Sequence, residues 1–238
     1  MSKHHLILVP GLMCDAAVWA HQARQLETAA TIAIPDHGSI DSLGNMAEAI
    51  LKSAPARFAI AGHSMGGRIA FEVFRRAPDR IEGMALMDTA YAPRPAGAPG
   101  EAEAAQRYAL LDIARTEGTR AMAKIWVQNM VHPHRLSDTA LVNSILDMFS
   151  RKTPDVFAAA IKALLERPDA APLLTEIQCP TMVLCGRQDA WSGLNRHEEI
   201  AARIAHSDLV VIEDCGHMST MERPEHVTAA MKAWLNSL

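Results

Sequence analysis

The chain has 238 residues, of which 49% are hydrophobic and 21% charged, and its 23 Lys and Arg against 27 Asp and Glu give a net charge of −4. This composition excludes a disordered chain and argues against a nucleic-acid-binding protein, which usually carries a clustered excess of basic residues. The length fits one domain, or one domain with an insertion. No apolar run approaches the roughly 20 residues of a membrane span, so we expect no membrane association.

Short apolar runs alternate with amphipathic segments in the first part of the chain. The strands are predicted at 6–9, 31–34, 58–61 and 81–87. The helices are predicted at 16–27, at 43–51 and from 69 to 77. Continuous apolar runs are typical of strands buried on both faces, and an i, i+3, i+4 apolar spacing is typical of helices. This alternation predicts a parallel sheet with helical crossovers.

The alternation stops after the fourth predicted strand. Residues 92–100 are rich in Ala, Pro and Gly, a composition that predicts a loop. Residues 101–167 carry helical periodicity and no credible strand signal, clearest at 156–165. A long, all-helical insertion is therefore expected here.

Strand signals return after the insertion, at 181–185 and 209–212, with a helix near 195–205 between them. The last helix begins at Pro224, a residue well suited to the first turn of a helix. The predicted domains are an α/β core formed by 1–90 and 173–238, and a helical cap formed by 91–172.

The segment Gly62-His63-Ser64-Met65-Gly66 lies where the third predicted strand passes into a helix. A serine at such a tight turn sits in strained backbone, and the small Gly62 and Gly66 give room for the flanking chain. The turn lifts the hydroxyl above the edge of the sheet, where a helix N-terminus favours developing negative charge. We therefore predict Ser64 as a nucleophile; the alternative is a structural serine in a Gly-rich turn.

An aliphatic hydroxyl needs a base to remove its proton. His217 follows the last predicted strand, beside Gly216, and is the predicted base. Asp189 lies just beyond the preceding strand and is the predicted carboxylate that orients the imidazole. Asp88, at the end of the fourth strand, is the competing carboxylate, with a capping or turn role as its alternative.

An oxyanion needs backbone donors, and two are predicted. The N–H group of Met65 follows the nucleophile, and the N–H group of Leu12 lies in the loop after the first strand. Met13 and Met218 flank the proposed site and are expected to line an apolar acyl pocket, with ordinary core packing as the alternative.

The cysteines lack the density of a secreted scaffold and the spacing of a metal site. They are Cys14, Cys179, Cys185 and Cys215. We therefore expect reduced thiols and a cytoplasmic protein. His132 and His134 have no third ligand at a suitable spacing, so no metal is expected.

Taken together, these motifs resemble the α/β-hydrolase superfamily over essentially the whole chain. The resemblance is carried by the nucleophile elbow at 62–66, the order Ser64, Asp189, His217, the helical cap after the fourth strand, the turn Asp36-His37-Gly38, and the segments 215–217 and 222–224. Two features depart from the family. Pro10-Gly11 stands where the family frequently has His-Gly, and the sheet begins at the family's third strand, which leaves about six strands.

The resemblance implies hydrolysis of a small-molecule carboxylic ester through an acyl-serine intermediate, without a cofactor. The same fold also serves carrier-linked methyl-ester hydrolases, C–C bond hydrolases and cofactor-free perhydrolases, and a small-molecule receptor with a vestigial site is the non-enzymatic alternative. The arginines of the helical segment are interpreted as a solvated face, with docking of a phosphate-bearing carrier protein as the alternative. They are Arg107, Arg115, Arg120, Arg135 and Arg151.

Overall fold

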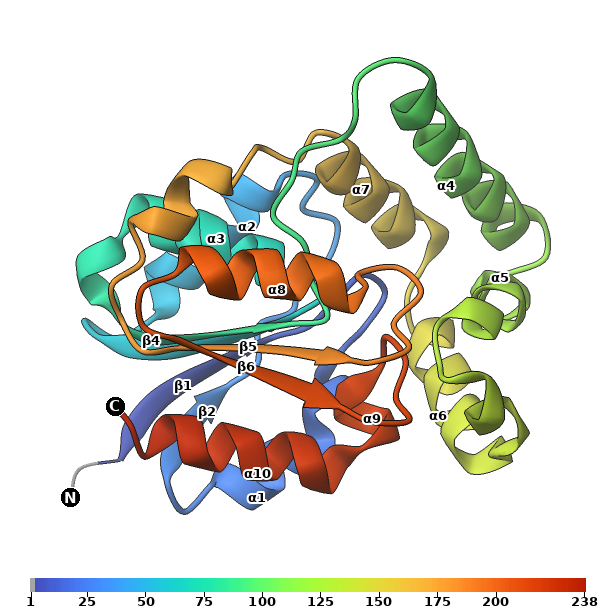
Figure 1. Ribbon diagram of the computed structural model, residues 1–238. Helices are drawn as coiled ribbons and strands as arrows, with labels where there is room; N and C mark the ends of the chain where they lie inside the picture. The colour runs from blue at the N-terminus through green and yellow to red at the C-terminus, as the bar shows by residue number, and fades with distance from the viewer. Residues whose placement is uncertain (1–2) are drawn as a thin grey trace.

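The computed structural model describes residues 3–238, and its centre is one parallel sheet (Figure 1). The strands are β1 (His4–Val9), β2 (Ala30–Ala33), β3 (Phe58–His63), β4 (Ile81–Met87), β5 (Thr181–Gly186) and β6 (Ser207–Ile212). Their order is β2-β1-β3-β4-β5-β6, and every pairing is parallel. The predicted parallel sheet with flanking helices is thus confirmed. Strands β3 and β5 are buried at every residue, which explains their continuous apolar runs.

Helices cover both faces of this sheet (Figure 1). On one face lie α2 (Leu43–Ser53), α3 (Met65–Arg76) and α8 (Leu194–Arg203). On the other lie α1 (Ala20–Leu26) and α10 (Pro224–Leu235), which pack against each other. Two layers of helices on a parallel sheet leave its carboxyl edge open for a site.

The segment between β4 and β5 is helical, and we call it the helical insertion. It contains α4 (Ala98–Thr116), α5 (Thr119–Trp126), α6 (Thr139–Ser150) and α7 (Pro154–Leu165). These helices lie beyond the carboxyl ends of the strands (Figure 1). Helix α4 begins at Ala98, inside the segment predicted as a loop, because Gly97 caps it with a φ of 66° and Pro99 suits its first turn. The boundaries given above for core and cap stay a prediction.

Two further differences from the predicted elements are local. The first predicted helix is divided into a 3-10 turn at Ala16–Trp19, capped by Asp15, and the α-helix α1. The short helix α9 (Ser219–Glu222) was not predicted, because four residues are too few to show an apolar period.

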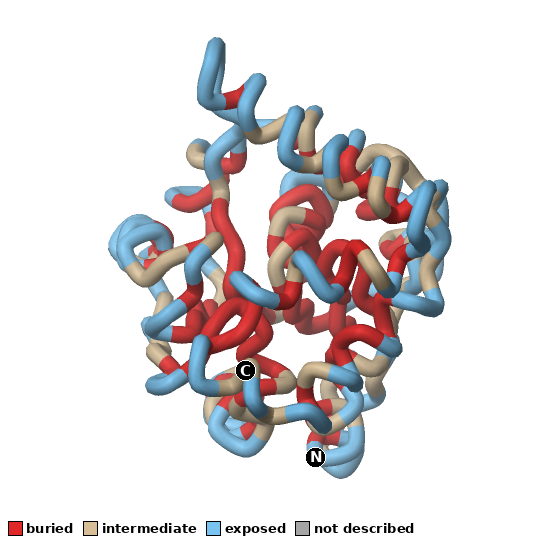
Figure 2. The backbone as a smooth tube through the Cα atoms, turned by 90° about the vertical axis from the view of Figure 1, so that its right-hand side faces the viewer, coloured by how far each residue is buried: buried red, intermediate tan, exposed pale blue. Residues whose placement is uncertain are grey.

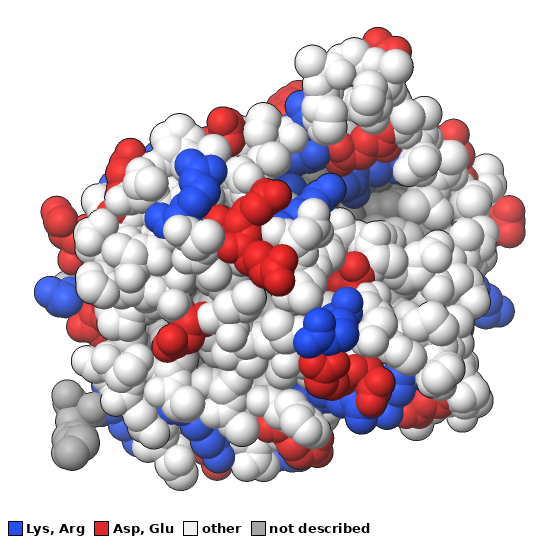
Figure 3. Space-filling view, viewed as in Figure 1, with Lys and Arg blue, Asp and Glu red and all other residues white. Residues whose placement is uncertain are grey.

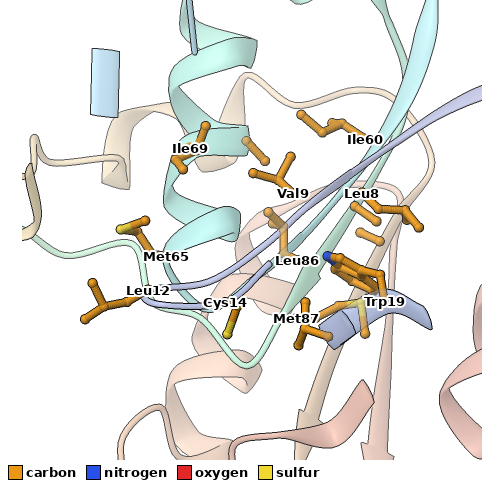
Figure 4. Packing of buried hydrophobic residues seen from close by; sticks show 14 of the residues in the cluster. Leu8, Val9, Leu12, Cys14, Trp19, Ile60, Met65, Ile69, Leu86 and Met87 are labelled. Atoms are coloured by element: carbon orange, nitrogen blue, oxygen red, sulfur yellow. The ribbon is translucent and has the colours of Figure 1, made fainter. Parts of the chain in front are cut away.

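The core lies between the sheet and its helices, where the buried chain is concentrated (Figure 2). Val9, Ile60 and Leu86 come from three neighbouring strands and lie on the same face of the sheet, with Ile69 of α3 on that side (Figure 4). Each such side chain stabilises the fold by roughly 1.5–3 kcal/mol when fully buried. Within residues 3–238, no helix has the length and apolarity to cross a membrane.

Candidate active site

The turn between β3 and α3 holds Ser64 in strained backbone. Its φ of 56° and ψ of −117° place a non-glycine residue in a region that costs on the order of 1–3 kcal/mol. A Cβ atom on Gly62 would lie 2.2 Å from the carbonyl oxygen of Gly66, and one on Gly66 would lie 2.1 Å from that of Val9. The turn therefore needs glycine at both positions. The Ser64 N–H donates to the carbonyl of Met87 at 2.8 Å, which ties the turn to β4.

Three predicted site residues from distant parts of the chain form one hydrogen-bonded series. The Ser64 Oγ lies 2.8 Å from His217 Nε2, and His217 Nδ1 lies 2.8 Å from Asp189 Oδ2. His217 and Asp189 are buried, whereas Ser64 is partly open to the cavity described below. The arrangement allows a proton to pass from the hydroxyl to the imidazole while the carboxylate fixes the tautomer.

The carboxylate of Asp189 is held in its ionised form. Its Oδ1 accepts hydrogen bonds from the N–H groups of Trp191 and Ser192 at 2.8 and 2.9 Å. Burial alone would raise the pKa of Asp189, but the charge and hydrogen bond of His217, with these two donors, outweigh it and lower that pKa to about 2. Burial likewise opposes the charged form of His217, and the charge and hydrogen bond of Asp189 overcome it, so the pKa of His217 is raised above its ordinary value.

Asp88, the competing carboxylate, has other partners. It accepts from the N–H of Gly186 at 3.0 Å and from the hydroxyl of Ser219 at 2.5 Å, and it is fully buried. Burial, with the nearby charge of Asp189, raises the pKa of Asp88 to about 8. His217 is hydrogen-bonded to Asp189 and not to Asp88. The partners of Asp88 are therefore those of a buried structural carboxylate.

The backbone of His217 is itself held by a second histidine. His63 donates from Nε2 to the carbonyl of His217 at 2.8 Å, because a carbonyl can only accept. Burial, with the charge of His217, lowers the pKa of His63 to about 3 and keeps it neutral. No sequence pattern indicates this role for the residue before Ser64.

Glu222 is a further residue that sequence reasoning missed. Its buried carboxylate accepts from the N–H groups of Gly216 and Met218, at 3.0 and 3.1 Å, on both sides of His217. It also accepts from the N–H of His132 in the helical insertion at 2.8 Å. From the sequence, Glu222 is only the first residue of the segment 222–224, which contributes to the family resemblance, and no role is predicted for it. Its contacts make it a residue that positions the loop carrying His217.

The two predicted oxyanion donors both border the cavity. A Cβ atom on Gly11 would lie 3.2 Å from the Cβ of Ser64, which shows how closely the loop after β1 approaches the turn. Figure 4 shows Leu12 on this loop and Met65 at the start of α3. Neither N–H group donates a hydrogen bond to any residue in the range 3–238. Both are therefore available to an oxyanion formed at Ser64.

The cavity above Ser64 has a volume of about 620 Å³. Part of its lining is aromatic: Trp191 lies with its ring centre 4.8 Å from that of His217, and Trp126 stacks on Trp191 at 5.2 Å. Met218 lines the cavity. Met13 does not, because the turn there, with a φ of 61° at Met13, brings Leu12 and Cys14 to the cavity instead.

The arginines of the helical insertion do not all lie on a solvated face. Arg107 lines the cavity and bonds to Glu103 at 2.9 Å, because its position on α4 faces the active site. Arg120 pairs with Asp147, and Arg151 pairs with Asp15 at 2.7 Å, both in exposed positions. Arg115 is exposed. The solvated-face interpretation is thus wrong for Arg107.

The described residues offer neither a metal site nor a reactive thiol beside Ser64. Across residues 3–238, no group of three or more His, Cys, Asp or Glu side chains could hold a metal ion. Burial raises the pKa of Cys14, next to the site, to about 12, and also raises that of Cys215. These thiols stay protonated at neutral pH and are not thiolate nucleophiles.

Comparison with known proteins places the chain among hydrolases. A model of the Alpha/beta hydrolase family matches residues 6–231. The pimeloyl-(acyl-carrier protein) methyl ester esterase of Aromatoleum aromaticum is 25% identical, covering 94% of this chain and 95% of the relative. The (E)-2-((N-methylformamido)methylene)succinate hydrolase of Acinetobacter baylyi is 25% identical, covering 98% and 90%.

A solved structure with a similar fold is a malate-bound thermophilic esterase from Thermogutta terrifontis. It superposes with a TM-score of 0.90 at 28% identity, covering 99% of this chain and 90% of that one. The enol-lactonase of Burkholderia xenovorans superposes with a TM-score of 0.85 at 23% identity, covering 99% and 92%, and shows the fold alone.

Proposed function

Because the chain belongs to the alpha/beta hydrolase family, we propose that it is a serine carboxylesterase that cleaves small-molecule esters through an acyl-serine intermediate. The observation that carries the proposal is the hydrogen-bonded series from Ser64 through His217 to Asp189 at a cavity. Segment 91–172 is proposed as the cap over this cavity, and the cytoplasm as the location.

In the first half of the proposed reaction, Ser64 Oγ forms a bond to the ester carbonyl carbon while its proton passes to His217 Nε2. The carbonyl oxygen becomes an oxyanion and accepts hydrogen bonds from the N–H groups of Leu12 and Met65. Asp189 stabilises the imidazolium through Nδ1. The carbon–oxygen bond to the alcohol then breaks, and His217 returns the proton to the leaving oxygen.

In the second half, water replaces the alcohol. His217 Nε2 accepts a proton from the water as its oxygen attacks the acyl carbon, and a second oxyanion forms in the same place. The bond from the carbon to Ser64 Oγ then breaks, and the proton on His217 returns to Oγ. The products are the carboxylic acid and the starting enzyme, with no cofactor in the balance.

The names of similar proteins support ester hydrolysis and leave three related reactions to be tested. Relatives are named as a carrier-linked methyl ester esterase and, in Escherichia coli at 26% identity, as a 2-hydroxy-6-oxononadienedioate/2-hydroxy-6-oxononatrienedioate hydrolase. The same three side chains would serve a carrier-linked ester, a C–C bond substrate or a perhydrolase. Ester hydrolysis requires a nucleophile, a base and two oxyanion donors. These are the roles proposed here for Ser64, for His217 and for the N–H groups of Leu12 and Met65.

A fluorophosphonate probe tests the proposed function, because only an activated serine reacts with it. We expect stoichiometric labelling at Ser64, together with hydrolysis of 4-nitrophenyl esters that varies with acyl length. Labelling is measured by intact-protein and peptide mass spectrometry. A folded protein that neither labels nor hydrolyses any ester of the series would contradict the proposal and favour the receptor alternative.

The pH dependence of kcat/KM reports the base. Only neutral His217 can accept the Ser64 proton, so activity is lost as pH falls through the pKa of that imidazole. Because this pKa is raised above its ordinary value of 6.5, the midpoint of the acid limb is expected above pH 6.5, followed by a plateau. Steady-state kinetics from pH 5 to 9 would measure it. A midpoint clearly below 6.5, or a limb abolished by a chelator, would speak against this base.

A further inference from the structure

Arg68 stands in the cavity without an acidic partner among residues 3–238. Arg68 lies on α3, one helical turn after Ser64, and lines the same cavity. No carboxylate within residues 3–238 lies within 4 Å of its guanidinium, whose hydrogen bond is to the carbonyl of Ala92 at 2.9 Å. A guanidinium carries five N–H donors, so most of the hydrogen-bonding capacity of Arg68 is unused by the protein.

Three more guanidinium groups surround this residue. We call Arg68, Arg107, Arg167 and Arg196 the arginine cluster; all four line the cavity. They come from α3, α4, the segment after α7, and α8. Burial lowers the pKa of Arg68 to about 9, and repulsion from the other three arginines adds to this, against the attraction of Glu103. The shared cavity and this repulsion both place the other three guanidinium groups near Arg68.

The acidic residues of the cavity do not balance these cations. The carboxylate of Glu103 accepts hydrogen bonds from Arg107, at 2.9 Å, and from Arg167, at 2.7 and 2.8 Å. Glu199 accepts from the hydroxyl of Tyr91 at 2.9 Å. Four cations against two carboxylates leave two positive charges in excess in the lining. Figure 3 shows basic and acidic side chains gathered beside the hollow that opens below α4.

A purely structural role explains only part of this cluster. Arg68 and Arg167 both donate to the carbonyl of Ala92, which holds the segment after β4, but a neutral carbonyl leaves the charge of Arg68 uncompensated. Arg196 is exposed and has no carboxylate within 4 Å in the described chain. Like charges held together without enough counter-charge favour an added anion.

The position of Arg68 would place such an anion in the same cavity as Ser64. Arg68 lies in the first turn of α3, which begins directly after Ser64, and both residues line the same cavity. The planar guanidinium of Arg68 matches a carboxylate, which it can bind with two parallel hydrogen bonds. We propose that the arginine cluster binds a free carboxylate of the substrate, which is therefore an ester bearing a second, unesterified carboxyl group. This inference rests on the proposed esterase function and adds the substrate class.

Paired esters that differ only in the carboxylate test it. One pair places the charge in the acyl part: mono-4-nitrophenyl glutarate against 4-nitrophenyl pentanoate. The other places it in the alcohol part: 4-acetoxybenzoate against phenyl acetate. In at least one pair, the wild-type kcat/KM for the anionic ester is expected to exceed that for the neutral ester by about tenfold or more.

Variants then assign the preference to the cluster. In Arg68→Gln the ratio of anionic to neutral kcat/KM is expected to fall at least about tenfold, mainly through KM, and Arg68→Lys should recover part of it because the charge remains. Arg115→Gln is the matched control, since this arginine is on α4 but exposed and outside the cavity lining, and its ratio should equal that of wild type.

The outcomes separate the two proposals. No preference for the anionic ester in either pair, or the same ratio in Arg68→Gln as in Arg115→Gln, overturns the carboxylate subsite while esterase activity stands. If Arg68→Gln does not fold, the exposed Arg196→Gln carries the test, and an unchanged ratio there overturns the inference. Absence of hydrolysis of all four esters, together with absence of fluorophosphonate labelling, overturns the esterase function instead.

Discussion

Replacing Ser64 with alanine is expected to reduce kcat/KM for ester hydrolysis by at least about 10⁴-fold, because the acyl-serine bond can no longer form. The fold should survive. The Ser64 side chain makes one hydrogen bond, to His217, and its strained backbone is held by the surrounding turn rather than by the hydroxyl. The melting temperature is therefore expected to stay within a few degrees of wild type, and fluorophosphonate labelling to disappear.

The control for this prediction is Ser144→Ala. Ser144 is an exposed serine on α6 whose hydroxyl bonds only to the carbonyl of Ala140, so both activity and labelling should match wild type. A Ser64→Ala protein that keeps a tenth of the wild-type rate would remove Ser64 from the role of nucleophile.

The second large effect is expected for Asp189→Asn, which should lower kcat by up to about 10⁴-fold. An amide in this place donates rather than accepts, so it disfavours the tautomer with the proton on Nδ1 and no longer stabilises the imidazolium. The N–H groups of Trp191 and Ser192 still find an amide oxygen at the same position, so we expect the loop to remain folded.

Asp88→Asn is the matched comparison, since it makes the same change in the other buried carboxylate. With its pKa raised to about 8, Asp88 is mostly protonated at neutral pH, and an asparagine can accept from Gly186 and donate to Ser219. We expect its kcat to stay within about tenfold of wild type. Kinetics at pH 7 with circular dichroism on both variants would decide the ranking. The reverse order would make Asp88 the carboxylate that serves His217.

Much of the candidate site could be predicted because its signals are local. The glycines at 62 and 66 mark a tight turn, and Ser64, Asp189 and His217 each follow a predicted strand. Carboxyl ends of parallel strands meet at one edge of a sheet, so residues far apart in the chain are expected together there. The structure brings these three side chains within hydrogen-bond distance, and the family predicted from the same motifs is confirmed.

The residues that sequence reasoning missed owe their place to contacts between segments that are distant in the chain. Arg68 looks like an ordinary charged position on an amphipathic helix, and only the approach of α4 and α8 places it in a cationic cavity. Trp191 faces His217 and Trp126 at once, and no local period indicates such a contact. Glu222 binds N–H groups that are 4, 6 and 90 residues away along the chain. Long-range packing, not local preference, decides these positions.

The carboxylate of Glu222 also connects the helical insertion to the loop that carries His217. Together with the hydrogen bond from the His217 N–H to the carbonyl of Met130, at 2.8 Å, it fastens the 130–132 segment of the insertion to the histidine loop. Moving the insertion away on this side would remove the His132 N–H from the buried carboxylate of Glu222 and break the hydrogen bond from the His217 N–H to Met130. Helix α4 packs chiefly on α5 and α7 instead of the sheet layers. A change in segment 130–132 is therefore expected to shift His217, whereas no hydrogen bond within residues 3–238 connects α4 to the histidine loop.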